Sequence, residues 1–245
     1  MFRQSNLLGA FPHLIAVEST RHGGVSAAPY HSLNLGVNTE DNPAHIQQNR
    51  ERFFAALGIQ EAMVATSHQV HSDAVLIAET SGRREGYDAI VTNKKGLFVA
   101  VSVADCTPIL VYDARRQVVA AIHAGWKGTM LQIVRKTLET MQEAFGSQPE
   151  DCYAYIGTCI DECSYEVGEE VAQHFGEAFK SWNADRQKFM LNLKAANKAL
   201  LLNWGISEAR IEVSPYSTVL NNDTYFSHRH EKGTTGRMMA LIGMK

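Results

Sequence analysis

Cysteine is scarce in this chain of 245 residues, which contains only Cys106, Cys152, Cys159 and Cys163. Four thiols are too few for a disulfide scaffold in a chain of this size, so we expect reduced cysteines and a cytoplasmic protein. Proline is also rare, with six residues, and no Pro/Ser-rich linker, repeat or low-complexity tract divides the chain. We therefore predict a single domain over residues 1–245.

Neither sign of charge dominates, because 23 basic and 26 acidic residues leave a formal net charge of −3 and are scattered along the chain. Nucleic-acid-binding proteins usually concentrate basic residues in a stripe or tail, so we expect no nucleic-acid partner. Long apolar runs are missing as well. The longest early one, residues 7–17, is interrupted by Pro12 and His13. It predicts a buried strand, and neither a signal peptide nor a membrane span.

The remaining composition is that of an ordinary globular protein, with 45% hydrophobic and 20% charged residues. Three segments carry the start and stop signals of helices. They cover residues 43–57, which follow Asn42 and end at Gly58, residues 129–145, which end at Gly146, and residues 192–204, which end at Gly205. Residues 168–180 are a weaker helix candidate, because Gly176 interrupts them.

Between the first two predicted helices the sequence changes to short β-rich runs, at residues 74–79, 88–92, 97–103, 108–113 and 118–123. Two segments, SGRREG (81–86) and DARRQ (113–117), have the composition of turns. Nearly continuous apolar strands with helices before and after them indicate β layers that are covered by helices. The predicted fold class is therefore mixed α/β.

Potential metal ligands are concentrated in three segments near predicted strand ends: SHQVHSD (67–73), ADCTP (104–108) and HAGWKGT (123–129). Taken singly, each residue is more often structural, and free cysteine is among the most buried residue types. Together, His71, Cys106 and His123 offer two imidazoles and one thiolate, which suit Zn²⁺ and leave a fourth tetrahedral position for water. The spacing between them matches no short zinc motif.

The same segments belong to a longer series of motifs. In chain order these are RHGGVS (21–26), SLNLG (32–36), NRERF (49–53), QVHSD (69–73), DAIVT (88–92), VADCTPIL (103–110), AAIHAGWKGT (120–129), YEVGEEV (165–171), FSHRH (226–230) and TTGR (234–237). Over nearly its whole length the sequence resembles the multicopper polyphenol oxidoreductase or laccase-domain family, whose members are also described as purine nucleoside phosphorylases and as a peptidoglycan editing factor.

The resemblance implies a zinc site at His71, Cys106 and His123, and a mixed α/β fold similar to that of some bacterial deamidating toxins. It also implies that purine nucleosides and phosphate are the substrates. The expected reactions are phosphorolysis of adenosine, inosine and methylthioadenosine, and hydrolytic deamination of adenosine.

The two kinds of reaction need different chemical groups in the site. A zinc ion beside a single thiolate keeps net positive charge and lowers the pKa of a bound water to roughly 7, which suits attack on C6 of adenine. Phosphorolysis needs an anion site near ribose C1′. In GWKGT, the backbone N–H groups of Gly125 and Gly128 and the charge of Lys127 would bind phosphate at a helix N-terminus. The alternative is a tight strand-to-helix turn without a ligand.

Five further positions are secondary candidates for the site. His68 is a candidate proton shuttle, although its odd separation from the predicted ligand would direct the two side chains to opposite faces of a strand. Arg50 is either a second anion ligand or a solvated helix-face arginine. Asp105 either orients a ligand or caps a turn. His228 and His230 form the only H-x-H pair in the chain. They line either the pocket mouth or a polar loop.

The sequence also departs from the family pattern. Lys127 stands where the family usually has Arg, so that a bidentate anion contact becomes a point-charge contact. Ser217 stands where a Cys is frequent, and His228, Arg229 and His230 stand where Tyr-Arg-Arg is usual. GTCIDECSYEV (157–167) replaces a Gly-Pro-rich turn. These departures concern substrate preference more than the metal ligands.

Other functions remain open at the level of the sequence. A copper-dependent polyphenol oxidase would need more paired histidines than one H-x-H provides. In a thiol hydrolase or deamidase, Cys106 would be the nucleophile and His123 its base. A metal that only stabilises the fold is a third possibility. A peptidoglycan-precursor editing role is a cellular assignment that the predicted site does not explain.

Overall fold

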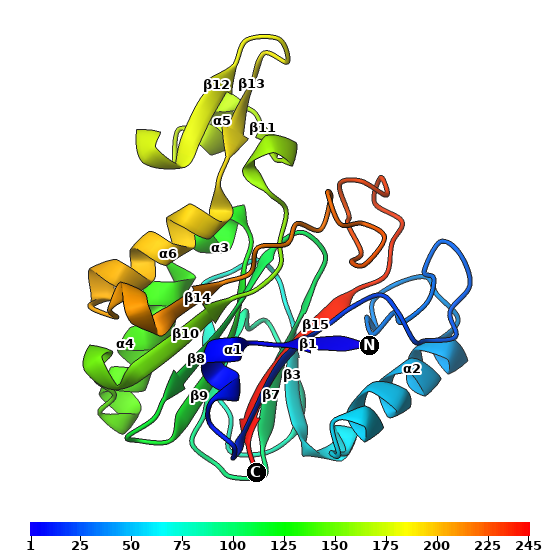
Figure 1. Ribbon diagram of the computed structural model, residues 1–245, viewed down its shortest axis with the longest axis vertical. Coiled ribbons are helices and arrows are strands. Elements are labelled where there is room, and N and C mark those ends of the chain that lie inside the picture. Colours follow the sequence, from blue (N-terminus) through cyan, green and yellow to red (C-terminus); the bar gives the residue numbers. More distant parts are fainter.

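The computed structural model describes residues Met1 to Lys245 and shows β-sheets packed in layers with helices outside them (Figure 1). Two sheets have six strands each and a third has three. In sheet A the order is β1 (Phe2–Gln4), β2 (Leu14–Ser19), β15 (Met238–Met244), β7 (Phe98–Val103), β3 (Val64–His68) and β5 (Gly82–Glu85). In sheet B it is β14 (Ile211–Val213), β10 (Cys152–Ile156), β8 (Thr107–Asp113), β9 (Val118–Ala124), β6 (Ala89–Thr92) and β4 (Val75–Ile77). The small sheet consists of β11 (Glu166–Val167), β13 (Lys188–Leu191) and β12 (Lys180–Asn183).

Helices occupy much of the remaining chain. The α-helices are α1 (Asn6–Gly9), α2 (Pro43–Ala56), α3 (Trp126–Met130), α4 (Ile133–Phe145), α5 (Glu169–Ala172) and α6 (Leu193–Trp204). Short 3₁₀ helices span Glu61–Met63, Pro149–Asp151, Glu162–Ser164, Glu177–Phe179 and Glu208–Arg210. None of these helices combines the length and apolar character that crossing a membrane requires.

Three apolar cores hold the layers together. Sheets A and B face each other across one core, in which Val99 of β7 packs with Leu110 of β8. The outer face of sheet A is covered by α2 through Phe53. The outer face of sheet B is covered by α4 and α6 through Leu138 and Leu201. The predicted mixed α/β fold with helix-covered sheets is therefore confirmed.

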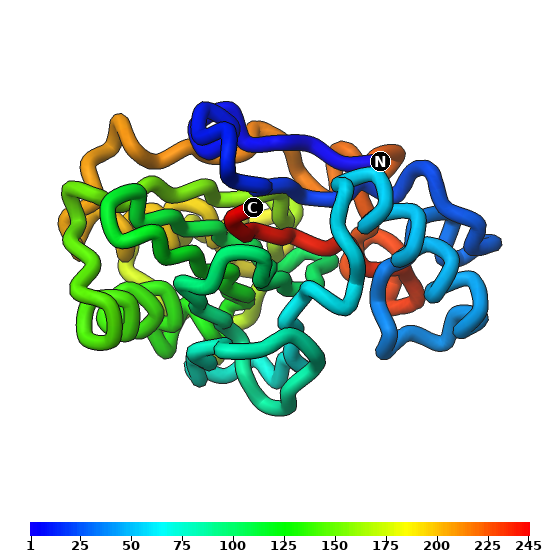
Figure 2. Tube along the Cα trace, turned by 90° about the horizontal axis from the view of Figure 1, so that it is seen from below, coloured from blue at the N-terminus to red at the C-terminus, as the bar shows by residue number.

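The two ends of the chain are joined within sheet A. Strand β15 lies between β2 and β7 and is antiparallel to both. Figure 2 shows the N-terminal and C-terminal segments running together along this sheet. The small sheet, with α5 beside it, projects from the layered body in Figure 1.

Two of the three predicted helices agree closely with the structure. The side chain of Asn42 caps α2 by accepting a hydrogen bond from the Ala44 N–H, and Asn192 caps α6 by accepting from the Ala195 N–H. Gly205 ends α6 with φ +113°, a conformation that glycine adopts without steric cost. Polar caps and terminal glycines are thus reliable markers of these boundaries.

The single helix predicted over residues 129–145 is wrong, because this segment covers the end of α3 and all of α4, with a break between them. Gln132 has φ +62°, which interrupts the helical backbone before Ile133. Neither glycine nor proline stands at the break, so no local signal marks it. In the weaker candidate, residues 168–180, only α5 and the 3₁₀ turn Glu177–Phe179 are helical, one on each side of Gly176.

Two other predictions are corrected. SGRREG was predicted as a turn but contains β5, which pairs in parallel with β3 at the edge of sheet A. Its residues are all exposed, so the strand lacks the apolar alternation that reveals a half-buried one. Residues 7–17 were predicted as one strand, but the first of them belong to α1, whose N-terminus Ser5 caps by accepting from the Leu8 N–H. Only the second part enters β2.

Candidate metal centre

The three predicted ligands converge at one end of the two main sheets. Cys106 directly precedes β8, and His123 lies near the end of the neighbouring strand β9. The antiparallel register pairs Pro108 with His123, which brings Cys106 to the end of β9. His71 reaches the same point from the loop between β3 and β4. One nitrogen of each histidine and the Cys106 sulfur lie within 4.8 Å of one another.

This group fits a tetrahedral metal ion. Zinc–nitrogen distances of about 2.0–2.1 Å and a zinc–sulfur distance of about 2.3 Å place neighbouring ligand atoms about 3.3–3.6 Å apart. Cys106 Sγ and His71 Nε2 are 3.9 Å apart, close to that spacing. A Cβ atom at Gly125 would lie 2.9 Å from Cys106 Sγ and 3.2 Å from His71 Cδ2. Gly125 therefore keeps space open beside the ligands, and the group can hold one metal ion.

A buried carboxylate, Asp88, orients the ring of His123 and holds the backbone of His71. It accepts a hydrogen bond of 2.8 Å from His123 Nδ1, which directs the other ring nitrogen towards the ligand group. It also accepts backbone N–H bonds from Val70, His71 and Ser72, at 3.2, 3.0 and 2.7 Å. Burial raises the pKa of Asp88, but hydrogen bonds and charge from His123 and Ser72 outweigh burial and lower it to about 2. Asp88 is thus an ionised anchor behind the candidate ligands.

The backbone at two positions of the site adopts a conformation that is unusual outside glycine. His71 has φ +58° and Asp105 has φ +86°. Such residues store strain and persist where surrounding contacts hold them. The N–H of His71 is held by Asp88, and the carboxylate of Asp105 accepts from Thr218 Oγ1 at 2.5 Å and from the Arg229 N–H at 2.6 Å. Asp105 thereby ties the segment before Cys106 to the C-terminal loop.

The electrostatics favour a thiolate at Cys106. Burial raises the pKa of its thiol, but the charges and hydrogen bonds of His123 and His71 outweigh burial and lower it to about 6. The other three thiols shift in the opposite direction: burial raises the pKa of Cys152 and Cys159, and Asp161 raises that of Cys163. Only Cys106 therefore supplies the deprotonated sulfur that a metal requires.

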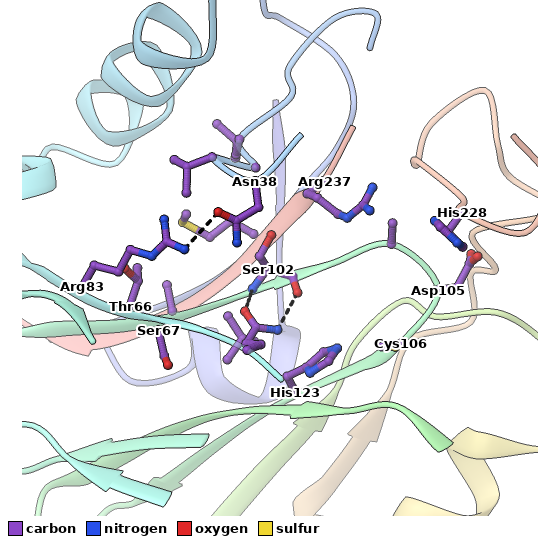
Figure 3. Close-up of a pocket in the computed structure, with 18 of the residues that line it drawn as sticks. Asn38, Thr66, Ser67, Arg83, Ser102, Asp105, Cys106, His123, His228 and Arg237 are labelled. Carbon is purple, nitrogen blue, oxygen red and sulfur yellow. Dashed lines mark hydrogen bonds between the residues drawn. The ribbon is translucent and has the colours of Figure 1, made fainter. Parts of the chain in front are cut away.

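The ligands open onto a cavity of about 560 Å³. Residues of β3 and β7 line it where these strands separate, because the strands pair only through Val64 with Phe98 and Ala65 with Val99. Beyond that point, the Gln69 side chain donates to the Ser102 carbonyl and accepts from its N–H, each at 2.8 Å. Figure 3 shows Ser102 between His123 and Arg83. The Gln69 side chain thus replaces the strand that would otherwise pair with the Ser102 backbone, and the cavity stays open.

The other residues predicted for the site lie outside the His-Cys-His group. Arg50 lines the cavity, but Glu61 lies 2.6 Å from Nη2 and the Leu35 carbonyl accepts from Nη1. His68 is exposed, is paired with Glu85 at 2.7 Å and does not line the cavity. Its role as a proton shuttle stays a prediction.

Lys127 is exposed on α3 and does not line the cavity, and neither does Gly128, which is buried within the same short helix. The phosphate cradle predicted at GWKGT stays a prediction that this geometry does not support.

Near the C-terminus, His228 and Arg229 line the cavity, whereas His230 does not. Cys152 and Cys159 are buried, and Cys163 is exposed. None of these three belongs to the ligand group.

Three contributors to the site escaped the sequence analysis: Asp88, Gln69 and Arg237. Asp88 begins the apolar run DAIVT, where an acidic residue at the edge of a buried strand is the only signal. Arg237 ends the TTGR motif and lines the cavity. Residues far along the chain determine the roles of these three, so the sequence immediately around each of them does not reveal its role.

The fold and the site together define a layered α/β protein with one His-Cys-His group in the wall of a large cavity. The family model described as multi-copper polyphenol oxidoreductase laccase matches residues 15–245. The chain belongs to this family.

Individual relatives agree with this assignment. A purine nucleoside phosphorylase of Deinococcus radiodurans is 39% identical over 246 residues, which cover 100% of this chain and 92% of the relative. The purine nucleoside phosphorylase YlmD of Bacillus subtilis is 34% identical, over 95% of this chain and 89% of the relative. A crystal structure of YlmD from Geobacillus stearothermophilus superposes with a TM-score of 0.93 and 29% identity, covering 100% and 96% of the two chains. That of the hypothetical protein YfiH from Bacillus licheniformis gives 0.92 and 31%, covering 100% and 99%.

Proposed function

We propose that this protein is a zinc-dependent enzyme that cleaves purine nucleosides by phosphorolysis and deaminates adenosine hydrolytically. His71, Cys106 and His123 would hold the zinc, and adenosine, inosine and methylthioadenosine would be substrates. The observation that carries the proposal is the convergence of these ligands at the wall of a cavity of about 560 Å³. Two relatives also support the proposal, because those from Deinococcus radiodurans and Bacillus subtilis are called purine nucleoside phosphorylases.

The donor set favours zinc over copper. Two imidazoles and a thiolate suit a single zinc ion, and three protein ligands leave a further coordination position. The structure contains one group of three possible ligands, whereas a multicopper centre would need several such groups. When bound, zinc supplies a Lewis acid and lowers the pKa of a water molecule at the site.

The chain's own residues prepare the site for this ion. Asp88 fixes the tautomer of His123, because the hydrogen bond to Nδ1 leaves Nε2 free to bind a metal. The lowered pKa of Cys106 makes its sulfur a ready ligand near neutral pH. Gly125 leaves room beside the sulfur. These features describe a site that is organised for metal binding and open to a substrate.

The cavity suits an amphipathic nucleoside. Its wall combines apolar side chains from sheet A, such as Val101 and Met239, with polar ones, such as Thr66 and Ser67. Tyr165 adds an aromatic ring near the metal ligands, which is a surface on which a purine can stack. In phosphorolysis, a phosphate oxygen forms a bond to ribose C1′ while the C1′–N9 bond breaks and the base leaves with its bonding electrons. The site must therefore hold a nucleoside and an oxyanion together.

Product analysis tests the proposed reactions. We expect inosine to give hypoxanthine and ribose 1-phosphate only when phosphate is present, whereas adenosine gives inosine and ammonia without phosphate. Separation of bases and nucleosides by liquid chromatography, with an assay for ribose 1-phosphate, measures both. Release of hypoxanthine from inosine at the same rate without phosphate would show hydrolysis in place of phosphorolysis. No conversion of any nucleoside by zinc-loaded protein would refute the proposed function.

A second candidate function is a thiol hydrolase or deamidase. It is favoured by the pKa of Cys106, which His123 and His71 lower to about 6, as in an activated nucleophile. Alkylation with iodoacetamide separates the two functions. A zinc-bound thiolate is protected and becomes reactive after treatment with a chelator, whereas a nucleophilic thiolate reacts at once, with loss of activity.

A further inference from the structure

Arg237 enters the cavity from a rigid support. Its N–H donates to Asn34 Oδ1 at 2.9 Å, its carbonyl accepts from the Leu35 N–H at 3.1 Å, and it directly precedes β15. A Cβ atom at Gly36 would lie 2.6 Å from Arg237 Cγ, so the arginine side chain occupies the space that this glycine leaves. The SLNLG and TTGR motifs, about 200 residues apart, thus brace one arginine.

Only part of the Arg237 guanidinium is used within the protein. Nη1 donates to the carbonyls of Thr235 and Gly236, at 2.9 and 3.0 Å, which accounts for both of its hydrogens. Nε and Nη2 have no protein acceptor, and no carboxylate forms a salt bridge with the group. Arg21 and Arg50 differ in this respect, because they pair with Glu231 at 3.0 Å and Glu61 at 2.6 Å.

No carboxylate in the surroundings bonds to this edge of the guanidinium. Asp105 also lines the cavity, and Figure 3 shows it on the same side as Arg237 and His228. However, its two oxygens already accept from Thr218 Oγ1 and the Arg229 N–H. Burial lowers the pKa of Arg237, while the charges of Cys106 and Asp105 partly offset this effect. A partly desolvated charge without a partner is costly, and an anionic ligand removes that cost.

We propose that Nε and Nη2 of Arg237 form the phosphate subsite of the cavity. Two parallel N–H donors in a plane match two oxygens of a tetrahedral oxyanion, which is the geometry that distinguishes arginine from lysine. The subsite lies on the wall that contains Asp105 and His228, and GWKGT is not part of it. This inference rests on the proposed function, because it names the part of the same cavity that takes the second substrate of phosphorolysis.

Kinetics with four variants of the zinc-loaded protein test the subsite. Arg237→Gln should raise the KM for inorganic phosphate about ten- to hundredfold, the loss expected for charge-assisted hydrogen bonds, while the KM for inosine changes much less. Arg237→Lys keeps the charge but not the two-donor edge, so its phosphate KM should lie between those of Arg237→Gln and wild type. Lys127→Ala should leave the phosphate KM unchanged. Arg84→Gln is the matched control, because Arg84 is exposed and lies outside the cavity lining.

Calorimetric titration with inorganic phosphate gives a readout that does not depend on turnover. Wild type and Arg84→Gln should bind phosphate with equal affinity, and Arg237→Gln at least about tenfold more weakly. A phosphate KM and affinity that Arg237→Gln leaves unchanged would overturn the subsite, as would wild type that binds no phosphate. A raised phosphate KM in Lys127→Ala alone would place the anion at GWKGT instead. If phosphate binding depends on Arg237 but no nucleoside is cleaved, the proposed function fails and the anion site stands.

Discussion

Replacing Cys106 with alanine is expected to remove bound zinc and to reduce both phosphorolysis and deamination by more than about a hundredfold. Loss of an outer hydrogen-bond partner alone weakens metal sites about 10–100-fold, and this change deletes a ligand itself. The fold should persist, because Cys106 is only half-buried and lies outside the apolar cores. Elemental analysis for zinc beside the rate of inosine cleavage measures the effect.

Cys163→Ala is the matched control for this prediction. Cys163 is exposed and its sulfur contacts Asp161, so the variant should retain zinc and most of the activity. Equal loss of activity in both variants would contradict a separate role for Cys106. Activity that survives in Cys106→Ala with zinc still bound would show that the sulfur is not a ligand.

Asp88→Asn is expected to combine weaker zinc binding with a large loss of stability. The amide keeps one acceptor oxygen, whereas the carboxylate receives bonds from His123, from Ser72 Oγ and from three backbone N–H groups. We expect a loss of about 10–100-fold in zinc affinity and about 3–5 kcal/mol in the free energy of unfolding. Chelator competition and urea titration measure the two quantities.

Asp113→Ala separates the two effects, because Asp113 is also fully buried, at the far end of β8 from Cys106, and alanine removes the oxygen that accepts two backbone N–H bonds. It should lower the free energy of unfolding and leave zinc affinity unchanged. If both variants lose zinc to the same extent, the effect on the metal is a general result of destabilisation.

The stability contributed by Asp88 also depends on pH in a defined direction. Its pKa is about 2 in the folded protein and 3.8 in its ordinary state, so the contribution is complete above pH 3.8. It is lost as the pH falls from 3.8 towards 2, because the proton then binds more tightly to the unfolded chain. The Asp88→Asn variant should lack this part of the acid dependence in urea titrations at pH 2–5.

The sequence correctly predicted the helices and strands whose ends are marked by nearby residues. Helices α2 and α6 have an asparagine cap at one end and a glycine just beyond the other, and strands β7, β8 and β9 are continuous apolar runs. Elements that depend on distant partners were missed. Strand β5 is exposed and exists through its pairing with β3, and the break at Gln132 has no helix-breaking residue.

The residues of the site also divide into those that the sequence indicates and those whose role depends on distant partners. His71, Cys106 and His123 were predicted from residue types and from the resemblance, and the structure brings their ligand atoms together. Residue types alone contain no information on which groups orient a ligand. Asp88 acquires its role only because the loop before β4 folds over the start of β6 and because β9 lies beside β6. Similarly, Arg237 becomes an open donor only because Gly36 and Asn34 position it.

The central claim is that one zinc ion at the His-Cys-His group enables nucleoside phosphorolysis. It is tested most directly by removing metal with a chelator, adding zinc back in fractional amounts and measuring bound metal and inosine phosphorolysis on the same samples. We predict that activity rises in proportion to zinc and reaches a plateau at about one ion per chain. Full activity in the metal-free protein, or activity restored by several copper ions and not by zinc, would contradict the account.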